Sequence, residues 1–533
     1  MSNRREFLKK AGVSALALGT SPLWLGSCAK KADQPNIIFI MSDDHAEKAI
    51  SAYHDNLVQT PQIDRIAKEG VRFENSFVTN SICAPSRAVL LTGKYSHLNG
   101  LKDNRDEFDS SQQTFPKLLQ KAGYQTAMIG KWHLKTKPTG FNYWKILKGQ
   151  GNYYNPVFYE RNGKQEYTGY STDIITDEAI NFLNNREEEK PFCMLVHHKA
   201  PHRNFMPPIK YLGQFEDHKF PIPETLFDDY ETREKTAGAA DMRIEDMFLS
   251  FDLKLNPEDY EKQTGSGGLG KVDEEPRTYY KNQLNEEQIK AWEAHYDRIS
   301  EEFDQADLKG KELTEWKYQR YLRDYMGCIL SIDDNVGRLL DYLDQNNLRS
   351  DTIVIYTSDQ GFYLGEHGWY DKRFMYEESL SMPLLMRYPR EIKANQVKEE
   401  IVLNLDFAPT FLDFAGTEIP NDMQGHSLRP LLKDDKKIDW RDSMYYHYYE
   451  YPHGWHTVKR HYGVRTNRYK LIHFYNDVDI WEMYDLKKDP HELNNVYDDP
   501  DYSAVVTRLK KELKRLRKKY RDNKPVDTGS GSE

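Results

Sequence analysis

The sequence predicts an α/β protein with a large mixed, mainly parallel sheet sandwiched by helices, followed by a smaller C-terminal subdomain with an antiparallel sheet and a helix. Short apolar runs bounded by turn residues alternate with helical stretches, which is the pattern of parallel strands joined by helices. The chain has 533 residues, of which 38% are hydrophobic, so it can fill the cores of about two or three domains. From about residue 436 the composition shifts toward Tyr, His and Trp.

Charge and hydropathy exclude two classes of protein. The net charge is −10, and an acidic chain lacks the basic face that a general nucleic-acid binder needs. We therefore expect no nucleic-acid partner, and an anionic substrate would need a local group of cationic side chains. After the first 30 residues no stretch approaches the roughly 20 apolar residues that span a bilayer, so we expect the body of the protein to lie outside the membrane.

Residues 1–27 are predicted to be a signal peptide of the lipoprotein type. A basic segment with Arg4 and Arg5 precedes an apolar run that ends in Leu-Gly-Ser-Cys at Cys28. This ending resembles a lipobox, whose cysteine is acylated. Residues 28–35 would then be a tether, and the protein would be an exported bacterial lipoprotein, periplasmic or on the cell surface, that touches the membrane only through Cys28. The alternative is an ordinary secretory leader in which Cys28 is incidental.

Four predicted strands each end in charged or metal-competent residues. The strands and the residues that follow them are 36–41 before Asp43 and Asp44, 126–129 before Lys131 and His133, 192–196 before His197, His198 and His202, and 352–356 before Asp359 and Gln360. In open parallel sheets the ligand site lies beyond the carboxyl ends of the strands. We therefore expect these four segments to converge on one pocket.

The remaining segments complete the predicted organisation. Residues 36–435 form the main domain, within which residues 210–320 read as a polar, helical insertion with a mobile loop at Gly265-Ser266-Gly267-Gly268. Residues 436–525 form the C-terminal subdomain, and residues 526–533 form a flexible tail. The last predicted helix of the C-terminal subdomain places an apolar stripe on one face. The stripe consists of Val505, Val506, Leu509, Leu513, Leu516 and Tyr520.

Cys83 is predicted to lie at the N-terminus of a helix. Pro85 suits the first turn of that helix, and apolar residues follow it. A helix N-terminus attracts anions and would lower the pKa of a thiol, so a thiolate nucleophile is one interpretation. Besides Cys28 the chain has three cysteines, Cys83, Cys193 and Cys328. An odd number does not indicate a disulfide framework.

The segment from Cys83 to Arg87, Cys-Ala-Pro-Ser-Arg, is followed by Leu-Leu-Thr-Gly. It resembles the signature of the formylglycine-dependent sulfatases of the alkaline phosphatase superfamily, most of all the bacterial N-acetylglucosamine-6-O-sulfatases. The resemblance covers nearly the whole chain after the signal peptide and implies an alkaline phosphatase-like fold and a sulfuric ester hydrolase. The other pieces of the pattern are Asp43-Asp44, Gly130-Lys131-Trp132-His133, Ala200-Pro201-His202, Ser358-Asp359-Gln360-Gly361, Lys372 and the late segment 484–493.

The resemblance also implies a modified residue and a metal ion. A formylglycine-generating enzyme would convert Cys83 to the aldehyde residue formylglycine, and the modified residue would bind one Ca²⁺ together with Asp43, Asp44, Asp359 and Gln360. Hard Ca²⁺ prefers such oxygen ligands. Members of the family usually carry Asn or His where this chain has Gln360, whose amide oxygen stands on a longer arm. For Asp43-Asp44 alone, the alternative is a helix cap or turn.

Hydrolysis of a sulfate ester requires that its charge be offset, that a nucleophile attack in line and that the leaving oxygen receive a proton. In the family the nucleophile is a hydroxyl of the hydrated aldehyde. By resemblance, Arg87 and Lys131 would hold that hydrate, His133 would handle its proton, Lys372 would bind a sulfate oxygen, and His202 would be the general acid. Of His197 and His198, we expect at least one to pack or support.

The segment Asp371-Lys372-Arg373 resembles the corresponding region of sulfatases that act on N-acetylglucosamine 6-O-sulfate, so Asp371 and Arg373 would grip sugar hydroxyls. Trp455 and His456 lie in an aromatic stretch of the kind that stacks on a sugar ring, or that packs a domain junction. We predict an exo-acting carbohydrate sulfatase whose substrate is a small sulfated glycan. Its preferred group would be the 6-O-sulfate of N-acetylglucosamine, in the breakdown of glycosaminoglycans or mucin-type glycans.

Three alternatives stay open. A sulfatase for another sulfated sugar, a uronate or an aryl sulfate would share the same core. A phosphatase or phosphodiesterase of the same superfamily would normally use two zinc ions and a Ser or Thr nucleophile, but Gln360 is a poor zinc ligand and Cys83 stands in place of that hydroxyl. A non-catalytic glycan-binding lipoprotein would fit the anchor and the aromatic residues, but not the full set of metal and catalytic residues.

Overall fold

The structure, a computed structural model, describes residues 34–256, 280–433, 438–454 and 456–523. The predicted signal peptide, Cys28, the Gly-rich loop at 265–268, Trp455 and the predicted tail lie outside the described residues. Within the described ranges, no helix is long and apolar enough to cross a membrane. Cys83, Cys193 and Cys328 are all free and buried.

The centre of the molecule is a ten-stranded sheet in the order β13-β2-β12-β9-β1-β8-β4-β5-β6-β7. Its middle strands β9 (Thr352–Ser358), β1 (Asn36–Asp43), β8 (Phe192–Pro201) and β4 (Gln125–Gly130) are mutually parallel neighbours. These are the four strands predicted from the sequence, so their polar ends share one edge. The flanking strands are β5 (Tyr143–Leu147), β6 (Val157–Glu160), β7 (Gly163–Glu166), β12 (Leu384–Arg387), β2 (Val71–Phe73) and β13 (Gln396–Lys398).

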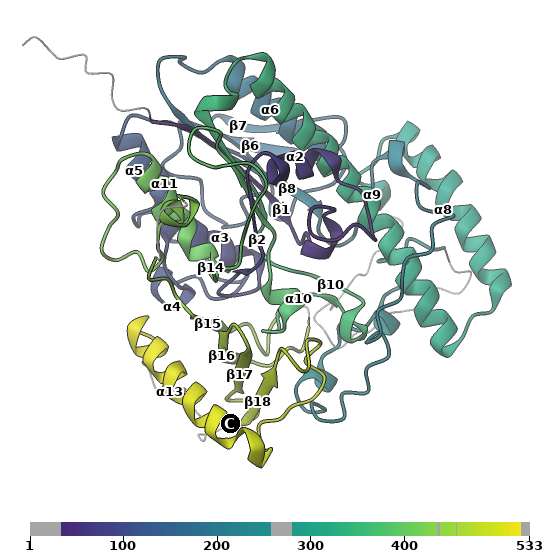
Figure 1. The fold of residues 1–533 in the computed structure, drawn as a ribbon. Helices are drawn as coiled ribbons and strands as arrows, with labels where there is room; N and C mark the ends of the chain where they lie inside the picture. Colours follow the sequence, from purple (N-terminus) through teal and green to yellow (C-terminus); the bar gives the residue numbers. More distant parts are fainter. Residues whose placement is uncertain (1–33, 257–279, 434–437, 455, 524–533) are drawn as a thin grey trace, which may run out of the picture. The chain divides into compact units, whose positions relative to one another are not determined.

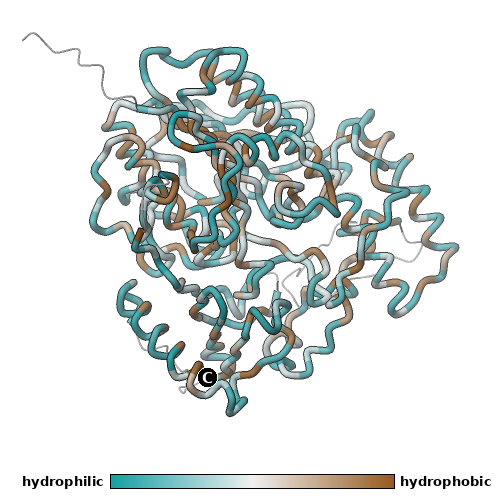
Figure 2. The backbone as a smooth tube through the Cα atoms, viewed as in Figure 1, coloured by the Kyte–Doolittle hydropathy of each residue, from teal (hydrophilic) through white to brown (hydrophobic). Residues whose placement is uncertain are grey.

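Side chains of β1 alternate between two cores because successive residues of a strand point to opposite faces. Ile38 and Ile40 belong to the core with α2 (Pro61–Lys68), α6 (Ser171–Asn184) and α9 (Gly310–Gln345). Ile37 and Phe39 belong to the core with α3 (Cys83–Thr92), α5 (Phe115–Lys121) and α11 (Phe407–Phe414). Helices therefore cover both faces of the sheet (Figure 1), and hydrophobic colour concentrates along its central strands (Figure 2).

The C-terminal subdomain is a four-stranded antiparallel sheet covered by α13 (Ser503–Lys519), at the lower left of Figure 1. Val506, Leu509, Leu513 and Leu516 are its buried positions, within the predicted stripe. The strands are β15 (Ser443–Tyr448), β16 (His461–Thr466), β17 (Tyr469–Phe474) and β18 (Ile480–Asp485). Together with the large mixed sheet, this confirms the predicted fold class.

Residues 210–320 contain α8 (Glu286–Ala306) and the first turns of α9. Asn285 and Gln288 form a capping box at the start of α8, and Trp292 and Tyr296 of α8 are buried in the core shared with the sheet. The short elements of the chain are η1 (Glu47–Ala49), β3 (Ser76–Phe77), α4 (Ser96–Asn99), η2 (Ile209–Tyr211), η3 (Ala237–Ala239), η4 (Ile244–Asp246), η5 (Arg349–Asp351), β10 (Tyr363–Leu364), η6 (Glu366–Gly368), β11 (Tyr370–Asp371), α10 (Glu377–Leu380), β14 (Val402–Leu403), η7 (Asn404–Asp406), α12 (Arg429–Leu432) and η8 (Pro500–Tyr502).

A buried ion cluster ties the C-terminal subdomain to the main domain. Lys470 of β17 is fully buried, and its Nζ lies 2.9 Å from Glu377 Oε1 and 2.6 Å from Glu492 Oε1. Burial raises the pKa of Glu377, but Arg465 and Lys470 outweigh it and lower that pKa to about 2. Removing one partner of such a cluster leaves an uncompensated buried charge.

We expect Lys470→Met to destabilise the protein by about 3–5 kcal/mol, measured as the free energy of unfolding in urea. Because the folded pKa of Glu377 is depressed, its contribution is present at neutral pH and is lost as the pH falls toward about 2. The difference between variant and wild type should therefore shrink in acid. The exposed Lys514 of α13 gives the matched control Lys514→Met, and an equal effect of both variants would contradict the prediction.

Candidate active site

The ends of β1 and β9 bring three carboxylates together. Asp43 is the last residue of β1, and Asp44 turns the chain with a φ of 68°. The Asp44 N–H donates to Asp359 Oδ1 at 3.2 Å. One oxygen from each of Asp43, Asp44 and Asp359 lies within 4.8 Å of the others, and all three residues are buried. This group, the carboxylate cluster, is the focus of the site.

Cys83 and Gln360 adjoin the carboxylate cluster. The Gln360 amide contacts Asp44 Oδ1 and donates to Cys83 Sγ at 3.5 Å. Cys83 Sγ, Asp43 and His202 also offer ligand atoms within 4.8 Å of one another. Among the described residues, buried Asp43 Oδ1 and Gln360 Oε1 have no hydrogen-bond partner. A set of buried oxygens with spare lone pairs is what a hard divalent cation requires, so the residues present fit such an ion.

The electrostatics of Asp44 show the effect of crowding acids. Burial, followed by the nearby charges of Asp359 and Asp371, raises the pKa of Asp44 to about 6, although Lys372 opposes this. Like-charged carboxylates this close favour a proton or a cation between them.

Cys83 is the first residue of α3, with Ile82 as its N-cap, as predicted. The expected lowering of its pKa is wrong. Burial raises the pKa of the Cys83 thiol to about 12, and Cys83 is only 1% exposed. Burial thus opposes the thiolate form of Cys83, against the effect expected of a helix N-terminus.

Arg87 and Lys131 bind the carboxylate cluster from the side of α3 and β4. Arg87 donates to Asp359 Oδ2 from Nε at 3.1 Å and from Nη2 at 2.8 Å, and to the Lys131 carbonyl from Nη1 at 2.8 Å. Lys131 Nζ contacts Asp43 Oδ2. Both side chains are buried. The Arg87 guanidinium supplies positive charge where a bound anion would need it, whereas burial lowers the pKa of Lys131 well below its usual range.

The other histidines predicted near the site differ in their surroundings. Burial, together with the charges of Lys131 and Arg87, lowers the pKa of His133 well below its usual range. His197 Nδ1 lies 3.3 Å from Arg87 Nη1 and 3.2 Å from the Lys131 carbonyl oxygen, so His197 supports both residues. His198 is fully buried, and burial lowers its pKa to about 3, which makes it a neutral packing residue.

His202, which follows β8, and Lys372, which follows β11, both lie close to Asp44. Lys372 Nζ donates to Asp44 Oδ2 at 2.6 Å, and His202 Nε2 lies 3.7 Å from the same oxygen. Burial is the largest cause that lowers the pKa of His202, and the charges of Lys131, Lys372 and Lys199 add to it. Contacts thus bring the predicted metal-binding and catalytic residues to the carboxylate cluster, except His133, which is linked to the site only through the charges of Lys131, Arg87 and Lys372.

Asp371 and Arg373 flank Lys372, and both have left-handed backbone conformations, with φ of 82° and 96°. Asp371 Oδ1 accepts the Arg373 Nε hydrogen at 3.2 Å. His456 Nε2 lies 3.3 Å from Asp371 Oδ2, and His456 is only 4% exposed. In this structure His456 therefore supports Asp371 from behind, rather than presenting a stacking surface.

Two residues that support Arg373 were not predicted from the sequence. Glu450 is buried and pairs with Arg373 Nη1. Tyr446 of β15 donates its hydroxyl hydrogen to the Arg373 carbonyl at 2.6 Å and accepts the Ser81 N–H at 3.0 Å. Both belong to the aromatic stretch singled out in the C-terminal subdomain, but nothing in that stretch indicates which of its residues reach the site.

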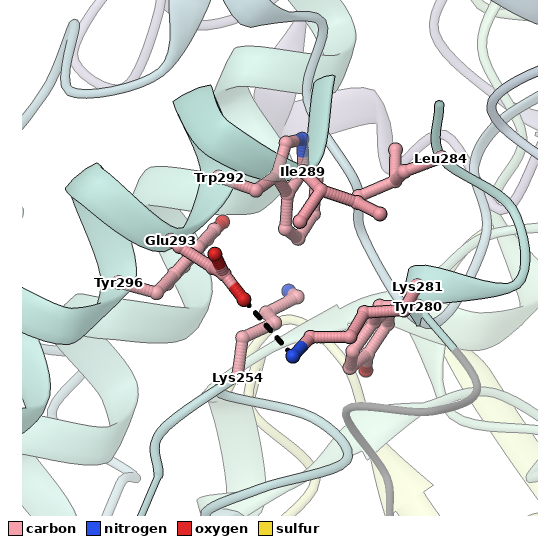
Figure 3. Close-up of a pocket in the computed structure, with 8 residues that line it drawn as sticks. All are labelled: Lys254, Tyr280, Lys281, Leu284, Ile289, Trp292, Glu293 and Tyr296. Carbon is pink, nitrogen blue, oxygen red and sulfur yellow. Dashed lines mark ion pairs between the residues drawn. The ribbon is translucent and has the colours of Figure 1, made fainter. Parts of the chain in front are cut away.

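A separate small pocket of about 30 Å³ lies beside α8. Figure 3 shows it between Trp292 of α8 and Tyr280, with the ion pair Lys281–Glu293 (2.9 Å) at its rim. Its lining is mostly aromatic and aliphatic and contains none of the predicted site residues.

Comparison with known proteins gives two family matches. The sequence model described as Sulfatase matches residues 35–417. The model described as N-sulphoglucosamine sulphohydrolase, C-terminal, matches residues 365–519. Together they span both domains of the described chain.

Among characterised relatives, the N-acetylglucosamine-6-O-sulfatase of Bacteroides thetaiotaomicron is 52% identical over 528 residues, which cover 97% of this chain and 93% of the relative. An arylsulfatase of Clostridium perfringens is 25% identical, with 90% and 94% covered. A solved structure described as a complex with its substrate D-glucosamine-2-N,6-O-disulfate superposes with a TM-score of 0.88 at 52% identity. It covers 93% of this chain and 99% of that one.

Proposed function

The chain belongs to the sulfatase family, and we propose that it removes the 6-O-sulfate of N-acetylglucosamine or N-sulfoglucosamine from glycosaminoglycan or mucin-type saccharides. As a member of this family it is a sulfuric ester hydrolase with the alkaline phosphatase-like fold. The observation that carries the proposal is the convergence of Cys83, Lys372 and His202 on the buried carboxylate cluster. The relative at 52% identity acts, by its name, on the same 6-O-sulfate.

We further propose that Asp43, Asp44, Asp359 and Gln360 hold one calcium ion, and that Cys83 is converted to formylglycine by a formylglycine-generating enzyme. The donor set consists of carboxylate and amide oxygens, which suits Ca²⁺ and does not suit the zinc pair of related phosphatases. When bound, the ion would offset sulfate charge, and the aldehyde residue would supply the nucleophile. Export and anchoring through Cys28 are part of the proposal and rest on the sequence alone.

The protein's own side chains then have distinct tasks. Lys372 and Arg87 bring buried positive charge to the site, which stabilises the negative charge of a sulfate group. Lys131 adds a buried hydrogen-bond donor beside Asp43. His202 Nε2 faces the same point, and once the ring has taken up a second proton there, Nε2 donates it to the leaving sugar oxygen. His133, held neutral by burial and by neighbouring cations, accepts a proton from the residue at position 83.

Substrate selection is assigned to Asp371 and Arg373. They flank Lys372, which binds sulfate, so they lie where the sugar ring attached to that sulfate must pass. Glu450 and His456 fix the two side chains. A guanidinium can donate to sugar hydroxyls and a carboxylate can accept from them.

A panel of sulfated monosaccharides tests this proposal. We expect sulfate release from N-acetylglucosamine 6-O-sulfate and glucosamine-2-N,6-O-disulfate, with the N-sulfate left intact. Arg373→Ala should raise KM for these sugars and lower kcat/KM by roughly 100-fold, since a buried hydrogen-bonding group loses its partner. Cleavage of a 2-O-sulfated uronate or of an aryl sulfate alone, with the 6-sulfated amino sugars untouched, would contradict the proposed substrate.

A further inference from the structure

The loop that carries His202 makes hydrogen bonds through two backbone carbonyls, those of His202 and Arg203. Tyr153 donates its hydroxyl hydrogen to the His202 carbonyl at 2.5 Å. His202 Nδ1 lies 2.6 Å from the Arg203 carbonyl oxygen. A carbonyl can only accept, so Nδ1 is the protonated nitrogen of the neutral ring and Nε2 is the nitrogen free to exchange a proton at the site.

The Arg203 carbonyl is in turn fixed through the Arg203 side chain. Arg203 donates to Asp252 from Nε at 2.7 Å and from Nη2 at 2.8 Å, which is a bidentate pair. Asp252 is fully buried. The guanidinium group of Arg203 also lies 5.0 Å from the centre of the Tyr370 ring. Tyr370 directly precedes Asp371 and Lys372 in the sequence.

Asp252 belongs to the insertion whose role the sequence did not reveal. Its Oδ2 also accepts the Phe248 N–H at 2.9 Å, so the carboxylate is locked into its own loop. Two residues later, Lys254, which is labelled in Figure 3, donates to the Phe205 carbonyl at 2.9 Å and to Asp324 at 2.8 Å. The insertion therefore holds the loop after His202 at two points.

We propose that Asp252 is a positioning residue for His202: by clamping Arg203 it holds the carbonyl that accepts the Nδ1 hydrogen, and so aims Nε2 at the carboxylate cluster. The inference rests on the proposed function, in which His202 is the proton donor. It assigns the insertion a task in the reaction, exerted through the loop after His202. Partners of this kind, which fix the tautomer and the plane of a histidine ring, typically change activity by about 10–100-fold.

A double-mutant cycle on the 6-sulfated sugar tests the inference. We expect Asp252→Asn to lower kcat/KM by roughly 10–100-fold in the wild-type background and by less than about 2-fold in the His202→Ala background, because the ring it positions is then absent. A merely structural role would cost the same factor in both backgrounds, and that result would overturn the proposal. If Asp252→Asn fails to fold, Arg203→Lys serves in its place, because it keeps the positive charge but loses the bidentate pair with Asp252. We expect the same dependence of its effect on His202.

The matched control is Asp228→Asn. Asp228 also forms a buried pair with an arginine of the insertion, Arg233, at 2.7 Å, but its partners do not touch His202. We expect this variant to lower Tm and to change kcat/KM by the same factor with or without His202. Coupling to His202 as strong as that of Asp252 would overturn the specific role of Asp252.

A second readout needs no substrate and so separates this inference from the proposed function. In protein labelled with ¹⁵N-histidine, the signals of His202, assigned by their loss in His202→Ala, should report a proton on Nδ1. In Asp252→Asn they should report a mixture of the two tautomers. An unchanged tautomer would overturn the inference, whereas a wild-type chain that releases no sulfate from any sugar would refute the proposed function alone.

Discussion

Replacing Cys83 by Ser abolishes turnover, with an expected fall in kcat/KM of at least about 10³-fold, because loss of a nucleophile removes most of the acceleration that a site provides. Ser differs from Cys by a single atom, so the packing around α3 is retained. A serine that stays unoxidised offers a single hydroxyl, which could not release sulfate by the route open to a hydrated aldehyde. The measurement is sulfate release from the 6-sulfated sugar, followed to the detection limit.

Two controls make the result specific. Cys193 and Cys328 are equally buried and free, and neither is among the predicted site residues, so Cys328→Ser should cost stability and leave kcat/KM within about 3-fold. The Tm of Cys83→Ser should stay within a few degrees of wild type. Substantial activity of Cys83→Ser, more than a tenth of wild type, with a serine that the peptide mass shows to be unmodified, would remove Cys83 from its proposed role.

The second large effect that we expect is the loss of activity when divalent cations are removed. Dialysis against a chelator should abolish sulfate release and lower Tm, because Asp43, Asp44 and Asp359 lie within 4.8 Å of one another and repel when nothing neutralises them. Re-addition of Ca²⁺ should restore both. An ion present at 100 times its dissociation constant stabilises a folded protein by about 2.7 kcal/mol.

From the carboxylate cluster we predict which variants lose the response of activity and Tm to Ca²⁺. Asp359→Asn keeps the shape of the side chain but removes one charge, and we expect at least about 100-fold weaker Ca²⁺ binding, measured by calorimetry. Asp341→Asn, at a carboxylate that is 56% exposed, should bind Ca²⁺ as wild type does. A chelator-treated protein with full activity and unchanged Tm would contradict the assignment of the carboxylate cluster to a metal ion.

Much of the fold and of the site was accessible from the sequence because its signals are local. Each central strand is a short apolar run followed at once by its functional residues, and parallel pairing places those residues together without further information. The order β9-β1-β8-β4 follows from no such local pattern. It is set by crossover connections, but any order among parallel neighbours would have kept the four ends on one edge.

The rest depends on packing between distant segments. Nothing in the neighbourhood of Asp252 or Arg203 in the sequence indicates their pairing across 49 residues, and the same holds for Arg373 with Glu450 or Lys470 with Glu492. The pKa of Cys83 was predicted in the wrong direction because a helix N-terminus contributes only about 0.3–1 kcal/mol. Complete burial of the thiol, visible only in the folded chain, outweighs it.

The central claim, that residue 83 acts at a buried cation site as a modified cysteine, is tested most directly by the mass of the tryptic peptide 73–87 from active enzyme. Conversion of Cys83 to the aldehyde makes this peptide about 18 Da lighter than the thiol form. We expect the lighter peptide in active preparations, and the thiol form in inactive protein from a host without the modifying enzyme. A fully active preparation whose peptide carries only the unmodified thiol would contradict the account.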